Sequence, residues 1–205
     1  MRTVNRIKSF FYVRHHHKGH DKKVSETSKC RASLAPFCQG DGVDVGFGGD
    51  PIVPNAICMD MPQGYAHYEN HVQHLHGDAR DLHWFCSCSL DWVYSSHVLE
   101  DFEDTRAVLH EWLRVIRPGG YVVLYLPDEQ TYRAHCHKQG KLPNIHHLHE
   151  DFSLDYVKRC LAHRDDVEIV HQRFPVGIYS FELGRPRRGR LNRRTASTRR
   201  PCDRQ

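Results

Sequence analysis

Short apolar runs alternate with polar segments through the middle of the chain, and their lengths are those of strands. The expected strands are 42–45, 56–59, 72–75, 90–94, 121–126, 167–171 and 178–183. The run at 121–126 is apolar throughout, as expected for a strand that is buried on both faces.

Two segments between these strands have helical patterns. Residues 105–116 carry apolar side chains at helical spacing, at Val108, Trp112, Leu113, Val115 and Ile116. The Arg-Pro-Gly-Gly sequence at 117–120 ends this helix. A second helix is expected at 153–162, with Asp151 or Ser153 as its N-cap. Alternating strands and helices predict an open, mostly parallel α/β sheet.

The charge divides the chain into three parts, although the net charge is only +4. Residues 1–40 carry a formal charge of +7, residues 41–183 carry −11, and residues 184–205 carry +8. We therefore expect a basic N-terminal extension at 1–40, partly helical or disordered, an acidic folded domain at 41–183, and a disordered Arg-rich tail at 184–205. An acidic body is unsuited to a polyanion, so specific nucleic-acid binding is not expected.

No apolar run approaches the roughly 20 residues that a membrane span needs. The eight cysteines include no Cys-x-x-Cys pair, and no secretory signal precedes the domain. We therefore expect reduced thiols and a cytoplasmic protein.

Glycines follow the first strand, in Asp44-Val45-Gly46-Phe47-Gly48-Gly49-Asp50-Pro51. Without a Cβ, Gly46 and Gly48 let the backbone approach a ligand closely. The pattern differs from the dinucleotide motif G-x-G-x-x-G because residue 51 is proline. A tight loop without a ligand explains it equally well.

Aspartates follow the second and third strands. Asp60 can accept both hydroxyls of a ribose, and Asp78 in Gly77-Asp78-Ala79 can accept a hydrogen bond from an exocyclic amine. Each is also explained as a turn or capping aspartate.

Two further motifs complete a series. Residues 89–101 read Ser-Leu-Asp-Trp-Val-Tyr-Ser-Ser-His-Val-Leu-Glu-Asp, and residues 112–121 read Trp-Leu-Arg-Val-Ile-Arg-Pro-Gly-Gly-Tyr. In order and spacing, the motifs between residues 43 and 126 resemble the class I S-adenosylmethionine-dependent methyltransferases.

This resemblance implies a Rossmann-like, seven-stranded sheet whose last two strands form an antiparallel hairpin. It also implies S-adenosyl-L-methionine as the cofactor. Gly46 and Gly48 would hold the methionine part, with Asp44 near the ammonium group, and Asp60 would bind the ribose. Asp78 and Ala79 would flank the adenine, and the segment from Ser95 and Ser96 to His97 would lie beneath the sulfonium.

The first crossover departs from the family pattern. Nine residues at 47–55, including two prolines, are too few for the usual helix between parallel strands. The first helix is therefore expected to be a turn or absent.

The segment after the fifth strand is rich in histidine, and the resemblance places it over the acceptor. His97, His147 and His149 are the expected general bases, since a histidine pKa near 6.5 suits proton removal at neutral pH. Surface histidines in a polar loop are the plainer explanation. We assign no metal, although these histidines with Glu150 form an alternative metal site.

The expected activity is methyl transfer to an oxygen or nitrogen atom of a small molecule or sugar. The alternatives are aminopropyl transfer on the same scaffold and a non-catalytic module that binds the cofactor. A serine hydrolase is excluded because no Gly-x-Ser-x-Gly elbow occurs.

Overall fold

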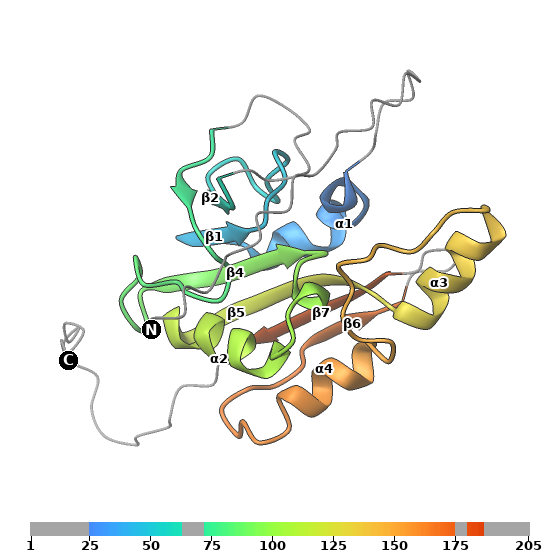
Figure 1. Ribbon diagram of the computed structural model, residues 1–205. Coiled ribbons are helices and arrows are strands. Elements are labelled where there is room, and N and C mark those ends of the chain that lie inside the picture. Colours follow the sequence, from blue (N-terminus) through green and yellow to red (C-terminus); the bar gives the residue numbers. More distant parts are fainter. Residues whose placement is uncertain (1–24, 63–71, 175–179, 187–205) are drawn as a thin grey trace, which may run out of the picture.

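The computed structural model describes residues 25–62, 72–174 and 180–186. These form one seven-stranded sheet in the order β3-β2-β1-β4-β5-β7-β6 (Figure 1). The strands are β1 (Gly42–Val45), β2 (Ile57–Asp60), β3 (Leu75–His76), β4 (Leu90–Ser96), β5 (Ile116–Pro127), β6 (His171–Arg173) and β7 (Ser180–Pro186).

Neighbouring strands from β3 to β5 are parallel, and β7 is antiparallel to both β5 and β6. The predicted fold class, with its antiparallel C-terminal pair, is therefore confirmed. In the register, Val45 lies opposite both Met59 and Ser95. The residues that directly follow β1, β2 and β4 consequently meet at one edge of the sheet.

No helix connects β1 to β2, as the short spacing predicts. The backbone N–H of Ile52 instead donates to Oδ2 of Asp44 at 2.8 Å, which folds the connection back over β1. The edge beside β1 is therefore closed by a loop rather than by a helix.

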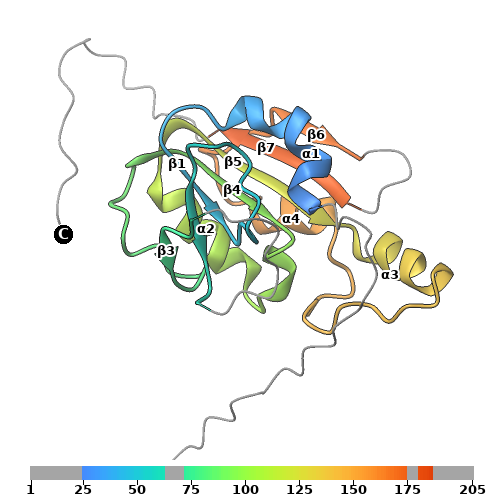
Figure 2. The ribbon, with the colours of Figure 1, turned by 90° about the horizontal axis from the view of Figure 1, so that it is seen from above.

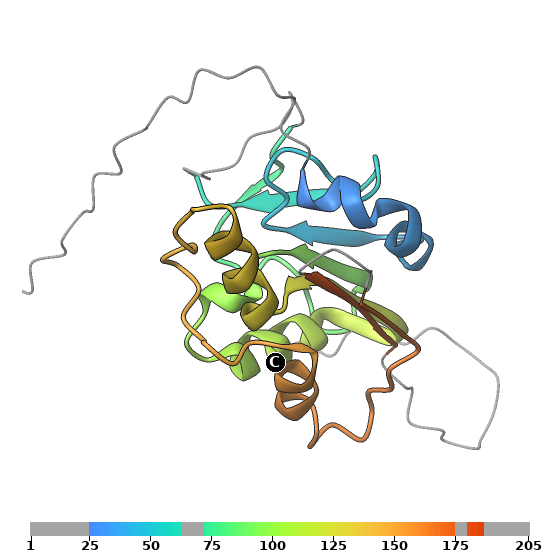
Figure 3. The ribbon, with the colours of Figure 1, turned by 90° about the vertical axis from the view of Figure 1, so that its right-hand side faces the viewer.

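Helices cover both faces of the sheet (Figures 2 and 3). Helices α2 (Thr105–Val115) and α4 (Leu154–Cys160) pack on one face, and α1 (Glu26–Leu34) with the 3-10 helix η1 (Ala35–Phe37) packs on the other. Helix α1 lies within the segment predicted as an extension. Because its Cys30 and Leu34 are fully buried, this segment contributes to the core.

Helix α3 (Glu129–Lys138) was not expected from the sequence. Its hydrophobic face is weak, and its start depends on Asp128, whose side chain accepts the backbone N–H of Thr131. Helix α3 lies at the edge where β4 and β5 end (Figure 1). It therefore borders the strand ends that position the site.

Every strand except β1 differs from its predicted bounds: β2 is shifted by one residue, β4 continues to Ser96, and β5 begins at Ile116, so the predicted helix stop at 117–120 lies within β5. β3 is confined to Leu75–His76, β6 begins at His171, and β7 continues through Pro186 into the predicted tail. β7 extends because its backbone pairs with β5 as far as Tyr121. The remainder of the tail, 187–205, lies outside the described residues, as do residues 1–24 of the extension. Among the described residues, no helix has the length and apolar character to cross a membrane.

Candidate active site

Two adjoining cavities open at the edge where the parallel strands end. The larger cavity has a volume of about 670 Å³ and is lined by segments that follow β1, β2, β3 and β4. The smaller cavity, of about 240 Å³, lies between the glycine loop, the start of α1 and the segment around α3. Gly46, Asp60, His97 and Val98 line both cavities, so the two are contiguous.

Gly46 is required at the point where the cavities meet. Its φ of +72° lies in the left-handed region, and a Cβ there would come within 2.3 Å of Cγ2 of Val98. Its backbone N–H donates to the carbonyl of Met59 at 2.8 Å. The glycine therefore keeps the chain close to β2 and leaves space above the backbone.

Asp60 connects the glycine loop to the end of β2. Its Oδ2 accepts the backbone N–H of Gly48 at 3.1 Å, and its Oδ1 accepts the backbone N–H of Met61 at 2.8 Å. Both bonds orient a carboxylate on the lining of both cavities. The position suits a group that binds ligand hydroxyls.

Asp78 and Ala79 line the larger cavity after β3. Nε of Arg80 donates to Oδ1 of Asp78 at 2.9 Å, and the Arg80 guanidinium lowers the pKa of this carboxyl. The carbonyl of Ala79 accepts Nε1–H of Trp112 at 2.7 Å. Asp78 is therefore ionised, and the loop is anchored to α2.

Asp44 and Ser95 were predicted to contact the cofactor, but they line neither cavity. Asp44 is fully buried beneath the first crossover, its Oδ1 has no hydrogen-bond partner within the described part of the chain, and burial raises its pKa well above the usual range. Ser95 donates its hydroxyl to the carbonyl of Val45 at 2.9 Å and so joins β4 to β1. In contrast, Ser96 lines the smaller cavity.

His97 directly follows β4 and lines both cavities. Its Nε2 lies 2.9 Å from Oγ of Ser180, and its Nδ1 lies 3.5 Å from Oε1 of Glu100. Burial lowers the pKa of His97 to about 4. The imidazole is therefore neutral at neutral pH. An ordinary histidine, with a pKa near 6.5, would be partly charged there.

His147 and His149 are separated by the fold. His147 lines the smaller cavity, with Nδ1 2.7 Å from Oε2 of Glu129. His149 lies outside both cavities, with Nε2 2.8 Å from the carbonyl of Phe102 and its ring against Tyr156. Its contacts attach the loop to the segment before α2 and to α4.

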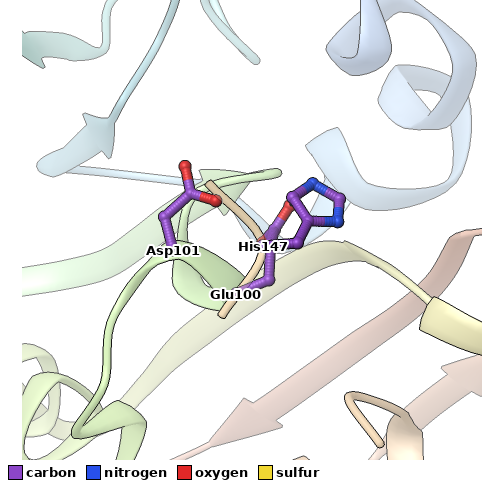
Figure 4. Close-up of side chains that lie close together, drawn as sticks. All are labelled: Glu100, Asp101 and His147. Carbon is purple, nitrogen blue, oxygen red and sulfur yellow. The ribbon is translucent and has the colours of Figure 1, made fainter. Parts of the chain in front are cut away.

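The sequence did not predict the carboxylates that surround His147, two of which are buried and one half-buried. Glu100 and Asp101 lie on η2 (Leu99–Asp101), and Glu129 begins α3. Figure 4 shows Glu100 and Asp101 close to His147, which comes from the loop after α3. The motif at 89–101 contained the first two residues, but no local pattern links them to Glu129 or His147.

The site has the features that S-adenosylmethionine requires. The larger cavity combines a carboxylate at Asp60 with an apolar lining that includes Met59, Ala79 and Phe102. A Cβ at Gly46 would fill the space where the two cavities join. Hydroxyl acceptors, an apolar slot and a glycine cradle therefore fit a nucleoside attached to a short polar chain.

Residues 54–124 match the family model described as a methyltransferase domain. No curated protein matches the chain at a significant level. Solved structures share its fold at low sequence identity.

The first similar structure is a chain from the complex that contains the Haloferax volcanii Trm112 methyltransferase activator. Its TM-score is 0.58 at 17% identity, covering 80% of this chain and 90% of that chain. An S-adenosylmethionine-dependent methyltransferase from Mesorhizobium loti has a TM-score of 0.58 at 13% identity, covering 82% and 100%. The PH0226 protein from Pyrococcus horikoshii has a TM-score of 0.58 at 15% identity, covering 82% and 94%.

The family match and the solved structures therefore agree on a methyltransferase-domain segment at 54–124 within a shared α/β fold, as the resemblance implied. At identities of 13–17%, the solved structures show only that the fold is shared.

Proposed function

We propose that this class I methyltransferase-fold protein binds S-adenosylmethionine and transfers its methyl group to an oxygen or nitrogen atom of a small acceptor. The observation that carries the proposal is the junction of the two cavities. Gly46, Asp60 and His97, from the ends of three parallel strands, line both. A cofactor in the larger cavity and an acceptor in the smaller one would therefore meet beside His97.

The residues of the larger cavity have distinct proposed roles. Asp60 accepts the ribose hydroxyls, and the segment containing Asp78 and Ala79 flanks the adenine. The backbone at Gly46, on the lining of both cavities, and at Gly48, on the lining of the smaller cavity, holds the methionine part at the junction. When bound, the cofactor supplies a methyl group on a positively charged sulfonium, and the acidic side chains of Asp60 and Asp78 favour that charge.

The smaller cavity is the proposed acceptor site. Its lining includes the side chains of Tyr132, Asn144 and His147, which come from α3 and the loop after it. These polar groups can orient a small acceptor. Most of the rate would come from holding the two reactants in line, an effect worth about 7–11 kcal/mol in favourable cases.

His97 is the proposed proton acceptor. It lines both cavities, and burial lowers its pKa to about 4, so the imidazole is neutral and able to accept a proton but is a weaker base than a histidine with a pKa near 6.5. A positioned base typically adds about 10²–10⁴-fold to a rate. His149 is not assigned this role because Phe102 and Tyr156 hold it outside both cavities.

The test combines binding with turnover. Calorimetry on the full chain should show S-adenosylmethionine binding, and a library of small hydroxyl and amine compounds should be screened with labelled cofactor. For an acceptor found in this way, His97→Gln should lower the single-turnover rate by roughly 10²-fold or more while cofactor affinity changes less than tenfold.

His149→Gln is the matched control and should leave the single-turnover rate unchanged. Equal rates for His97→Gln and the wild type would overturn the role of His97. Cofactor binding without turnover of any acceptor would favour the non-catalytic module. Absence of cofactor binding would overturn the proposed function.

A further inference from the structure

Glu100, Asp101 and His147 bring three ligand-type side chains together between the two cavities. One donor atom from each lies within 4.8 Å of the other two. Nε2 of His147 is 3.6 Å from Oε1 of Glu100. Ligand atoms lie about 2.0–2.2 Å from an ion such as Zn²⁺, so two ligands of one ion are at most about 4.4 Å apart. Small side-chain rotations therefore bring all three within reach of one ion.

The orientation of His147 is determined by Glu129. Nε of Arg133 donates to Oε1 of Glu129 at 2.7 Å, and Nδ1 of His147 lies 2.7 Å from Oε2 of the same carboxyl group. With Nδ1 bound to Glu129, Nε2 is the ring nitrogen that faces the cluster. Metal-binding histidines commonly donate their other ring N–H to a carboxylate in this way.

Three carboxyl oxygens of the cluster are buried without a side-chain hydrogen bond among the described residues, although Nδ1 of His97 lies 3.5 Å from Oε1 of Glu100. Neither carboxyl oxygen of Glu100 accepts a hydrogen bond from another described side chain, and the Glu100 side chain is 1% exposed. Oδ1 of Asp101 is also buried without a partner. Buried polar atoms are nearly always satisfied, so this pair of acceptors facing an imidazole lone pair needs a positive charge or a proton.

We propose that Glu100, Asp101 and His147 bind a divalent cation of the Mn²⁺ or Zn²⁺ type. Carboxylate oxygens suit Mn²⁺, and an imidazole nitrogen suits Zn²⁺ and neighbouring transition metals. A site of oxygen ligands alone would instead be expected for Mg²⁺ or Ca²⁺. Glu129 is a positioning residue that acts through His147.

The location suggests what the ion does, and this step rests on the proposed function. Asp101 lines the larger cavity and His147 lines the smaller one, so the ion lies between the proposed cofactor and acceptor sites. There it can bind an oxygen atom of the acceptor and stabilise its deprotonated form. The acceptor class is then a small molecule with a metal-chelating hydroxyl group.

The experiment measures Mn²⁺ binding to the full chain without cofactor or acceptor. After treatment with a chelator and dialysis, free Mn²⁺ is followed by electron paramagnetic resonance. One site is expected in the wild type. Glu100→Gln, Asp101→Asn and His147→Gln should each raise its Kd at least tenfold, and Glu129→Ala should raise it about 10–100-fold.

Two controls separate this site from adventitious binding. His137→Gln, which alters an exposed histidine on α3, should leave the Kd unchanged. A variant with alanine at His15, His16, His17 and His20 tests the N-terminal histidine run and should also retain the site. Melting temperatures show whether each variant folds. If Glu100→Gln fails to fold, Asp101→Asn still tests the site.

Absence of Mn²⁺ binding, or unchanged binding in the folded cluster variants, would overturn the site. Loss of binding in the N-terminal variant would also overturn it, because the ion would then belong to that run. S-adenosylmethionine affinity is measured separately without metal. Loss of cofactor binding would count against the proposed function, whereas loss of Mn²⁺ binding would count against the metal site.

Discussion

The backbone N–H of Gly48 lies 3.1 Å from Oδ2 of Asp60 and donates a hydrogen bond to it. This bond joins the loop after β1 to the end of β2, without a helix between the two strands. Asp60 consequently has two roles: it stabilises the glycine loop, and it presents a carboxylate to both cavities.

Changing Asp60 should separate these roles. Asp60→Ala removes charged hydrogen bonds to the proposed ribose and is expected to weaken S-adenosylmethionine binding by about 10–100-fold. Asp60→Asn keeps an oxygen that can accept from Gly48 but loses the charge, so it should weaken binding less. Calorimetry measures both variants.

Asp41→Asn is the matched control because Asp41 directly precedes β1, at the opposite edge of the sheet. Its cofactor affinity should equal that of the wild type. Equal affinities for Asp60→Ala and the wild type would show that Asp60 does not bind the ribose.

Gly46→Ala should reduce cofactor binding because the new Cβ would come within 2.3 Å of Val98 at the cavity junction. Gly119→Ala is the comparison: Gly119 has a φ of +88°, and its added Cβ would meet nothing within 4 Å. Both changes introduce left-handed backbone strain of about 1–2 kcal/mol, and Gly46→Ala adds the cost of displacing Val98. Only Gly46→Ala should also weaken S-adenosylmethionine binding, and equal affinities for the two variants would contradict this prediction.

Glu111 on α2 should contribute pH-dependent stability. Its Oε1 accepts the backbone N–H of Leu82 at 2.9 Å, and its Oε2 accepts Nε–H of Arg114 at 2.7 Å. Arg114 lowers the pKa of Glu111 below its ordinary value of 4.5. The stabilisation is therefore present above pH 4.5 and is lost as the pH decreases through the lower folded-state pKa.

Urea denaturation should show Glu111→Gln to be about 1 kcal/mol less stable than the wild type at pH 7, because the partly exposed ion pair is screened by solvent. The difference should shrink as the pH is lowered below 4.5. Glu103→Gln, at an exposed position, should show little difference at either pH. A difference in the free energy of unfolding that grows as the pH is lowered would contradict this prediction.

Leu34 tests where the folded domain begins. It is fully buried on α1, in the cluster that includes Trp92 and Tyr125, so Leu34→Ala should cost about 2–5 kcal/mol of stability. Leu142→Ala, at a side chain that is 92% exposed, should cost almost nothing. We propose a domain that spans 25–186, and equal stabilities for the two variants would favour a start near residue 41.

Deletion of residues 187–205 should leave both the melting temperature and cofactor affinity unchanged. The deleted sequence is rich in arginine and has no hydrophobic period, so its loss exposes no core. A decrease in melting temperature of more than a few degrees would show that this segment contacts the domain.

Chain order and local periodicity were sufficient to predict the class of fold. Alternating apolar runs indicated the strands, the prolines at 51 and 54 excluded a first crossover helix, and Asp60 followed its strand directly. These features depend on residues that are close together in the sequence, so they can be predicted from it. α1 and α3 were missed as core and site elements because their sequences lack a strong apolar face.

Side-chain direction and long-range packing were decided only by the tertiary structure. Asp44 faces away from the cavities because the pleat turns it toward the folded-back crossover, where Ile52 binds it. His147 and His149 differ by two positions, yet Glu129 holds one at the smaller cavity while Phe102 holds the other outside. The cluster of Glu100, Asp101 and His147 forms because η2 and the loop after α3 meet at the same sheet edge. By itself, the sequence determined which residue types reach that edge, whereas packing between distant segments decided which of them face one another.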